Sequence, residues 1–577
     1  MSSPRSSDLQ SSHSADNGIT TPSAPPHSPH HPEIFLLDHL PHAPQRQVDL
    51  DAHDAQKQLD IEKMDQESGA STPMPESESG EAPRRVIGFA RNDPENPVNW
   101  HWKKKFLPVF AAMMSVMNST ISSSLAAGST DQISEYFHIT SQAQLVLPTS
   151  IFLVGYVIGP LFFGPLSESY GRKLIMIVAF AVFTIFTLAC AVADTFAGLV
   201  VFRLLVGIPG SCAISVVGGV IADVYNDPTS RGRAMALFMA ATTFGPLIGP
   251  VASGFIAVVS WRWTFWLGLI IAGVTWIPLL AMPETYGPVI LKRRAKRLRK
   301  ESGDDDVFAP IELEPQDVRH VVTVVLTRPI RMMLFEWIVL FSCLYLSFVY
   351  AVFYMFFQAY PIMYRGTYGF NAGEEGLAFL PIGLGALIAC AMYLTYDAFL
   401  AGARARHRPW TRNEEARRLP LACAAGPFIV TSLFWAGWTA RPSIHWAAPV
   451  FAGVPFGVGY LLCFMAILNY LVDAYEVFAA SAMAAAGTSR SVFGAVLPFA
   501  TRPMYGALGV EWACSLLGFV MLGLCAIPFV FWRFGGTIRA NSAFCRELKE
   551  RRERQEEEDR QDERDDGDVE KGVGRGD

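Results

Sequence analysis

The chain has 577 residues, of which 51% are hydrophobic and only 17% are charged, with a formal net charge of −6. A soluble chain of this length would divide into several domains, each with a charged surface of its own. Here the charge is concentrated in the N-terminal region, in two basic stretches and at the C-terminus. This segregation excludes an ordinary soluble protein. Because acidic and basic residues nearly cancel, the net charge itself says little about partners.

The two ends of the chain are polar. Residues 1–95 are rich in Ser, Pro, His, Asp and Gln and lack the apolar core of a secretory signal. Such a composition cannot bury enough apolar surface to fold, so we predict a disordered cytosolic tail. Residues 535–577 are highly charged and predict a second cytosolic tail.

Between the tails lie apolar segments of about twenty residues, each long enough to cross about 30 Å of hydrocarbon. The predicted spans are 106–127, 143–163, 174–193, 196–219, 234–258, 264–282, 332–360, 375–398, 419–439, 447–471, 480–504 and 511–533. Six precede the hydrophilic central loop 284–330 and six follow it, which is typical of two bundled halves. We therefore predict an all-α membrane protein of 12 transmembrane helices in two six-helix bundles, 96–283 and 331–534.

Basic residues in the loops predict the orientation, because positive charge is retained on the cytosolic side. One set of loops carries Arg172, Lys173, Arg231, Arg233, most of 292–300, and a group of arginines between 404 and 418. The opposite loops carry Arg262, Arg365 and Arg441, with Arg502 at the outer end of the eleventh span. We therefore expect both chain ends to face the cytosol.

The loop after the second span contains the segment Gly-Pro-Leu-Ser-Glu-Ser-Tyr-Gly-Arg-Lys, residues 164–173. Gly164 and Gly171 allow tight turns, Glu168 can accept hydrogen bonds, and Arg172 and Lys173 hold the loop in the cytosol. The segment resembles the signature between spans two and three of the major facilitator superfamily, although Ser169 stands where a basic residue is usual. The resemblance implies a latch that stabilises the outward-facing state, and we name these residues the latch motif.

The fourth span contains an arginine. Placing Arg203 in a span costs about 2.5–3.5 kcal/mol, so a partner or a cavity is expected, unless the side chain extends to the nearby outer interface. With Gly207 and Gly210 it resembles the family motif in which a glycine follows an arginine by four residues. The resemblance implies a functional or switching role.

The fifth span contains Gly-Pro-Leu-Ile-Gly-Pro-Val-Ala-Ser-Gly, residues 245–254. Small residues four apart let helices approach closely, and the prolines bend the helix. The segment resembles the antiporter signature of the same superfamily, carried here by Gly245, Pro246, Gly249, Pro250 and Gly254. The resemblance implies export, while simple close packing would not require a direction of transport.

Three further segments, 96–100, 283–286 and 469–475, resemble fungal drug:proton antiporters with twelve spans, and most closely the group of polyamine, multidrug and secondary-metabolite exporters. This resemblance covers about residues 95–540. It implies proton-coupled export of an amphipathic compound, such as a glycolipid or an organic acid.

An antiporter needs a titratable group, yet no acidic residue lies near a predicted midplane, and Gln358 stands where many relatives carry glutamate. The best polar pair is Asp473 with Arg490, as a gate or as a coupling group. Polar residues within apolar spans predict the substrate cavity, although hydrogen bonds between helices are an alternative role. These residues are Asn118, Ser119, Ser122, Ser123, Tyr156, Gln358, Tyr360 and Asn469.

The sequence predicts no catalytic residues, no metal site and no cofactor, because it shows no histidine cluster, catalytic triad or metal-ligand spacing. The expected partners are a small-molecule substrate, protons and the lipid bilayer, without nucleic acid, and we expect a monomer. The expected location is the plasma membrane, with the vacuolar membrane as the alternative. An importer or facilitator of the same fold and a non-transporting membrane sensor are the alternative functions.

Overall fold

The computed structural model describes residues 85–90, 92–303, 306–313, 327–475, 478–542, 544 and 546. Most of both predicted tails and part of the central loop lie outside these residues. Eleven helices of the described part are long and apolar enough to cross a membrane. The fold is therefore that of an all-α multi-pass membrane protein, as predicted.

The first half contains six long helices. They are α2 (Trp102–Ser124), α4 (Gln142–Tyr170), α5 (Arg172–Ala191), α6 (Phe196–Val224), α7 (Pro228–Ile256) and α8 (Trp261–Ala281), with the short η1 (Pro97–Asn99), η2 (Ala127–Ser129) and α3 (Thr130–Phe137). Helix α4 packs on α6, and α2 packs on α7. The approach of α4 to α6 requires glycine, because a Cβ atom on Gly207 would lie 2.2 Å from the carbonyl oxygen of Phe152.

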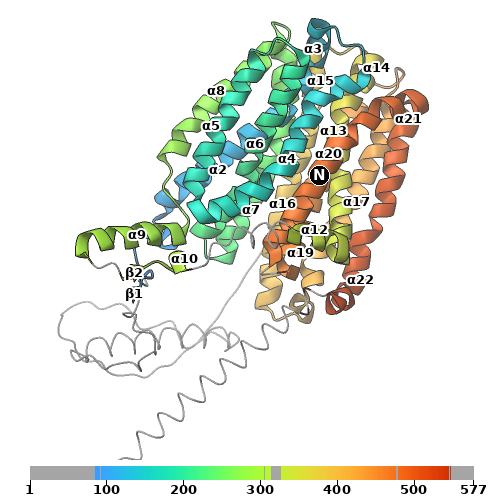
Figure 1. The fold of residues 1–577 in the computed structure, drawn as a ribbon. Coiled ribbons are helices and arrows are strands. Elements are labelled where there is room, and N and C mark those ends of the chain that lie inside the picture. Colours follow the sequence, from blue (N-terminus) through green and yellow to red (C-terminus); the bar gives the residue numbers. More distant parts are fainter. Residues whose placement is uncertain are drawn as a thin grey trace, which may run out of the picture. The chain divides into compact units, whose positions relative to one another are not determined.

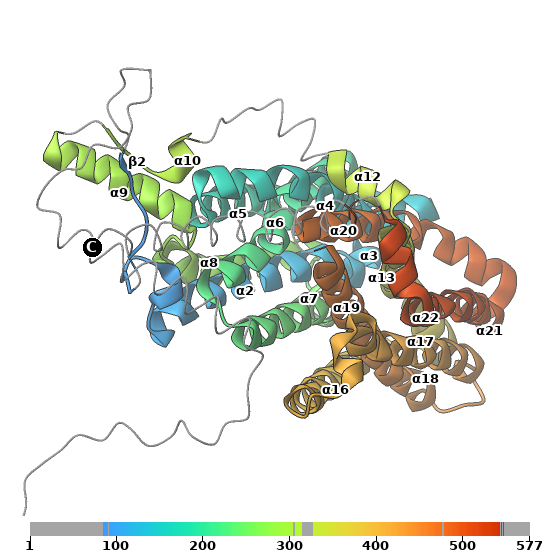
Figure 2. The same ribbon diagram turned by 90° about the horizontal axis from the view of Figure 1, so that it is seen from below.

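The second half begins with α12 (Thr327–Phe335) and the almost entirely buried α13 (Trp337–Tyr360). It continues with η4 (Pro361–Arg365), α14 (Gly366–Tyr368), α15 (Ala372–Leu377), α16 (Leu380–Ala405), η5 (Pro409–Arg412), α17 (Glu414–Thr439), α18 (Ala447–Phe451), α19 (Gly453–Tyr475), α20 (Ala479–Val496), α21 (Pro498–Leu524) and α22 (Ala526–Asn541). Seen from below, most helices of the two halves lie on opposite sides, and α20 of the second half packs beside α4 of the first (Figure 2).

The eleventh predicted span, 480–504, is not among the eleven apolar helices. Its first part is α20, which is rich in alanine, glycine and serine and carries Arg490. Helix α21 is interrupted at Gly509, which has a φ of 75° and a ψ of 169°. This break lies between the eleventh and twelfth predicted spans. The eleventh span therefore comprises α20 and the first part of α21, and the twelfth comprises the rest of α21 with α22.

A small unit beside the long helices joins the segment before the first span to the central loop. Strand β1 (Arg85–Val86) pairs in parallel with β2 (Val307–Phe308), next to α9 (Gly287–Ser302) and α10 (Pro310–Leu313). Figure 1 shows α9 lying across the direction of the long helices, near the ends of α2 and α5. Residues 85–90 and 92–95, which the sequence places in the tail, thus have defined partners.

Candidate functional site

The two ends of the bundle differ in how the halves meet. We name them the Arg172 end, where α4 passes into α5, and the Arg365 end, where α3, η4 and α15 lie (Figure 1). Within the described residues, the one ion pair that joins the two halves is Arg365 with Asp131. At the Arg172 end, the ion pairs of Arg172 stay in the first half and those of Arg418 and Arg539 stay in the second.

At the Arg172 end, the latch motif is built around Gly171. This residue has a φ of 96° and a ψ of 154°, a conformation that essentially only glycine adopts, and it separates α4 from α5. The buried Glu284 carboxylate accepts hydrogen bonds from the backbone N–H groups of Arg172 at 2.8 Å and Lys173 at 3.3 Å. Glu284 therefore caps the N-terminus of α5, where negative charge is stabilised by the helix dipole.

The side chain of Arg172 is buried and makes several polar contacts. It donates to the Ser167 hydroxyl at 2.6 Å and pairs with Asp223 at 3.2 Å, whereas Glu168 is more distant at 3.7 Å and largely exposed. The ring of Tyr286 lies 4.7 Å from its guanidinium carbon. The sequence identified Arg172 and Glu168 but not the stronger partner Asp223, which comes from the end of α6 and adjoins the motif only in the folded chain.

Gly164 has a different role from the one that the sequence predicts. It lies inside α4 rather than at a turn, and a Cβ atom there would meet nothing within 4 Å. The tight turn of the latch motif is therefore made by Gly171 alone. Because α4 continues to Tyr170, most of the motif is helical.

Arg203 does not extend to the lipid interface, because it is only 1% exposed. Its guanidinium donates to the carbonyl oxygens of Pro148 at 2.7 Å, Ser122 at 2.9 Å and Ser123 at 3.1 Å. The Phe152 ring lies 4.5 Å from the guanidinium carbon. Arg203 thus joins α6 to α4 and α2, and its charge is met by backbone dipoles rather than by a carboxylate.

The α7 motif lies in a position where it contacts both halves. A Cβ atom on Gly245 would lie 1.8 Å from the Thr120 hydroxyl of α2, and one on Gly249 would lie 2.0 Å from that of Ser124. One on Gly254 would lie 2.3 Å from the carbonyl oxygen of Ala372, in the second half. Pro250 also lies against α15, because a Cβ atom on Gly376 would come within 2.6 Å of its carbonyl oxygen. The motif therefore lets α2 and α15 both approach α7.

Acidic side chains that the sequence analysis did not select gather at the Arg365 end. Arg365 contacts both Asp131 of α3 and Glu375 of α15. Glu375 is buried, whereas the Asp131 side chain is 61% exposed. Nearby, Arg502 donates to Gln142 of the first half and, at 3.3 Å, to Gln358. No sequence motif marks this cluster, because its six members come from six separate elements.

The predicted pair of Asp473 and Arg490 is not formed in the described structure. Asp473 instead pairs with Arg418 of α17 at 2.8 Å. Arg490 points elsewhere, with its guanidinium carbon 5.5 Å from the ring of Tyr350 and 5.7 Å from that of Phe464. The separation arises because Asp473 lies near the end of α19, whereas Arg490 lies more than two turns inside α20.

Several predicted cavity residues bind neighbouring helices. Asn118 donates to Thr275 at 3.4 Å, Tyr156 bonds Ser119 at 2.6 Å, and Ser123 bonds Tyr354 across the two halves at 2.9 Å. Tyr360 lies among aromatic rings, 4.3 Å from the ring centre of Phe379. Ser122 is buried and offers its backbone carbonyl to Arg203.

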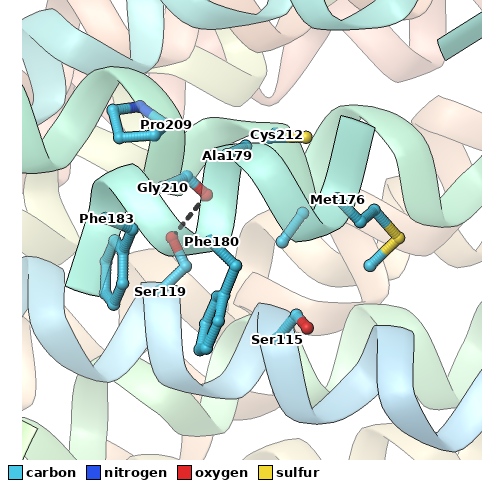
Figure 3. Close-up of a pocket in the computed structure, with 10 residues that line it drawn as sticks. Ser115, Ser119, Met176, Ala179, Phe180, Phe183, Pro209, Gly210 and Cys212 are labelled. Carbon is cyan, nitrogen blue, oxygen red and sulfur yellow. Dashed lines mark hydrogen bonds between the residues drawn. The ribbon is translucent and has the colours of Figure 1, made fainter. Parts of the chain in front are cut away.

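Two small cavities lie within the bundle. One, of about 10 Å³, lies in the first half beside Ser119 and Gly210, which are hydrogen-bonded to each other (Figure 3). The other, of about 20 Å³, lies between Met239 of α7 and Asn469 of α19, at the boundary between the two halves. Neither has room for more than about one water molecule, so neither holds an organic substrate in this conformation.

Comparison with known proteins identifies the family. Residues 109–498 match the Major Facilitator Superfamily, which is more than half of the chain. The chain belongs to this superfamily. It is therefore a membrane transporter for small molecules and not an enzyme.

Similar proteins come from filamentous fungi. The chain is 38% identical to a protein of Gibberella moniliformis named Efflux pump FUB11, over 81% of this chain and 78% of that protein. It is 37% identical to the Citrinin biosynthesis cluster MFS transporter mrr1 of Monascus ruber, over 81% and 95%. It is 36% identical to the Major facilitator superfamily multidrug transporter mdrA of Aspergillus fumigatus, over 83% and 80%.

A solved structure shares the fold. The proton:xylose symporter XylE of Escherichia coli, bound to a bromo-deoxyglucose, superposes with a TM-score of 0.54 at 15% identity. The match covers 75% of this chain and 96% of that one. At this identity the likeness concerns the fold alone.

Proposed function

We propose that this transporter is a proton-coupled exporter. Its cargo is a small amphipathic molecule, such as a secondary metabolite, an organic acid or a drug, and it acts as a monomer in the plasma membrane. The names of the relatives, which include an efflux pump and a multidrug transporter, support export. So does the resemblance of the α7 segment to an antiporter signature.

The observation that carries this proposal is the unequal contact between the halves. The Arg365–Asp131 ion pair and the approach of Gly254 to Ala372 join the halves at the Arg365 end. If the loop charges set the orientation, this end faces outward. The structure would then represent the inward-facing part of an alternating-access cycle, in which cargo enters from the cytosol.

We assign proton exchange to Asp131, the acidic residue that contacts Arg365 across the halves. Protonation of Asp131 removes the charge that attracts Arg365 across the halves, and this weakens the closure of the outer end, whereas Glu375 holds Arg365 from within its own half. Asp473, the coupling residue suggested by the sequence, pairs with Arg418 inside one half. Its protonation would therefore affect no contact between the halves.

The test uses the full chain in proteoliposomes with an imposed pH gradient. Three labelled probes of matched shape serve as cargo: phenylbutyrate, phenylbutyramide and phenylbutylamine, which are anionic, neutral and cationic. We expect at least one probe to move in the direction opposite to the protons. This movement should exceed the movement in vesicles without protein and in vesicles with the Gly245→Trp variant. Asp131→Asn should reduce this gradient-dependent movement more than Asp473→Asn does.

The alternatives give different results. Gradient-independent movement of a probe would identify a facilitator and contradict antiport. Movement only in the same direction as protons would identify an importer. If no probe moves although the protein binds one of them, the proposal of transport by antiport fails and a sensor is favoured.

A further inference from the structure

Arg490 is an interior cation that no acidic side chain among the described residues neutralises. It lies in the middle third of the eleventh span, which runs from Ala479 to the break at Gly509. Within the described residues, its guanidinium makes no hydrogen bond or ion pair, and its contacts are with aromatic rings. A charge at this depth is costly and calls for a compensating partner.

Arg203 shows what such compensation looks like in the same protein. Its guanidinium nitrogens reach three carbonyl oxygens at 2.7–3.1 Å, and the side chain is almost fully buried. Arg490, by contrast, remains partly exposed, and its planar group faces two rings. The donors of Arg203 are therefore used within the protein, whereas those of Arg490 remain available to an incoming acceptor.

The helices packed against α20 offer no acid at the depth of Arg490. Helix α13 contains no charged residue at all, and the single acid of α4, Glu168, lies at the Arg172 end beside Arg172. The single acid of α19, Asp473, pairs with Arg418. The remaining neighbours carry Arg328 and Arg331 on α12, and Arg502 and Glu511 on α21, of which Glu511 pairs with Arg441.

Aromatic side chains surround the guanidinium at the boundary of the halves. The rings of Tyr350 and Phe464 lie 6.3 Å apart, and Tyr460 lies 4.8 Å from Phe464. The charge of Arg490 also acts electrostatically on Tyr156 of α4, in the first half. The neighbourhood thus combines one cation with ring faces of the second half, close to Tyr156 of the first half, and the two halves move relative to each other in an alternating-access cycle.

We infer that Arg490 is the binding group for a negatively charged cargo, which is an amphipathic organic anion bearing a carboxylate or a similar oxyanion. This inference rests on the proposed function and specifies its substrate class. The guanidinium fork binds two oxygens of a carboxylate at once, and the low dielectric of the bundle interior strengthens that contact. The rings of Tyr350, Tyr460 and Phe464 hold the apolar part of the cargo.

The test measures binding separately from transport. The purified full chain in lipid nanodiscs is titrated with phenylbutyrate, phenylbutyramide and phenylbutylamine, and thermal stabilisation gives the affinity for each. We expect phenylbutyrate to bind at least about tenfold more tightly than the other two, because a hydrogen bond to a charged group is worth about one to two factors of ten. Equal binding of the three probes, or a preference for phenylbutylamine, would overturn the inference.

Variants assign the preference to Arg490. Arg490→Gln should lower the affinity for phenylbutyrate about 10- to 100-fold and leave that for phenylbutyramide unchanged. Arg490→Lys keeps the positive charge but lacks the planar guanidinium, so it should retain part of the preference for phenylbutyrate. This variant also tests the inference if Arg490→Gln proves unstable. The matched control is Arg441→Gln, at the outer end of the bundle.

Failure of the anion site and failure of the proposed export can be told apart. If Arg490→Gln and Arg490→Lys both keep the full preference for phenylbutyrate, the inference fails whatever the transport assay shows. If phenylbutyrate binds through Arg490 but no probe moves in proteoliposomes, the binding site stands and the proposed export fails. If only phenylbutyramide or phenylbutylamine is exported and phenylbutyrate is not bound, export stands and the anion site fails.

Discussion

At the scale of single residues, the two glycines of the latch motif lie in opposite environments. Gly171 has a backbone conformation that other residues avoid, and a Cβ atom on it would lie 2.4 Å from Oε2 of Glu284. Gly164 is helical and faces open space. One motif therefore contains both a required glycine and a replaceable one.

We predict that Gly171→Ala destabilises the protein by about 1–3 kcal/mol, because it imposes backbone strain and displaces the carboxylate that caps α5. Gly164→Ala should be neutral or stabilising by about 0.5–1 kcal/mol, since alanine favours a helix over glycine. Thermal unfolding of the two variants in nanodiscs checks the difference. Equal effects would show that the cap and the turn do not stabilise the fold.

The second prediction at this scale concerns Arg203. Arg203→Ala leaves three buried carbonyl oxygens without their donor, and we expect a loss of about 3 kcal/mol or more in the free energy of unfolding. Arg203→Lys should recover only part of this, because an ammonium cannot reproduce the planar fork. The control Arg441→Ala removes a half-exposed ion pair and should cost about 0–1 kcal/mol. Similar melting temperatures for Arg203→Ala and the control would contradict the assigned role.

The sequence identifies the residues of these sites better than it identifies their partners. Arg172 and Arg203 stand out because a motif or an insertion cost marks them. Asp223, Arg418 and Glu375 belong to no motif and meet their partners only across helices distant in sequence. The pairing of Asp473 with Arg490 was wrong because closeness in sequence across a turn does not fix which faces of α19 and α20 meet.

At the scale of elements, α9 explains why the segment before the first span is folded. Arg294 of α9 pairs with the buried Asp93, and Glu95 pairs with Arg297 at 2.9 Å. Apolar residues of α9 pack on β2 and α10 beneath these ion pairs, among them Val289, Leu291 and Ala295. The sequence could not show these ion pairs, because basic residues like those of α9 are also typical of a loop that positive charge retains on one side of the membrane.

This docking should depend on pH. The backbone N–H of Glu95 and the guanidinium of Arg294 lower the pKa of the Asp93 carboxyl. Since the folded state lowers this pKa, the stabilisation is complete above the ordinary pKa of an aspartate and is lost as the pH falls through the lowered value. Hydrogen exchange at the Ile87 amide, which donates to Phe308 at 3.0 Å, reports on docking.

We expect Asp93→Asn to reduce protection of the Ile87 amide at neutral pH and to remove most of its dependence on acid. Glu95→Gln, at a more exposed position, is the matched control and should have a smaller effect. Rates are corrected for the intrinsic pH dependence of exchange. Unchanged protection in Asp93→Asn would show that the apolar contacts of α9 suffice for docking.

At the scale of the whole molecule, hydropathy predicts the spans well because lipid imposes one length and one polarity on every spanning helix. It misses α20 as a separate span because that helix is rich in alanine, glycine and serine, carries Arg490 and packs against α13 and α4. Hydropathy carries no information about which end of the bundle is closed. That property depends on a few contacts between the halves, such as Arg365 with Asp131.

The closure at the Arg365 end yields the last prediction. Asp131→Asn removes the charge that attracts Arg365 across the halves, while Glu375 still holds Arg365 in its own half. Because Asp131 is largely exposed, the pair is worth about 1 kcal/mol, which changes the ratio of closed to open states about fivefold. Spin labels on the exposed residues Glu135 and Ser443, in a background without other cysteines, report the separation of the halves at this end. We expect the distance distribution in Asp131→Asn to gain a longer component.

Asp194→Asn is the matched control, because Asp194 pairs with Arg262 inside the first half and its loss should leave the distances unchanged. An unaltered distribution in Asp131→Asn would mean that the packing of α7 on α15, rather than the ion pair, closes this end.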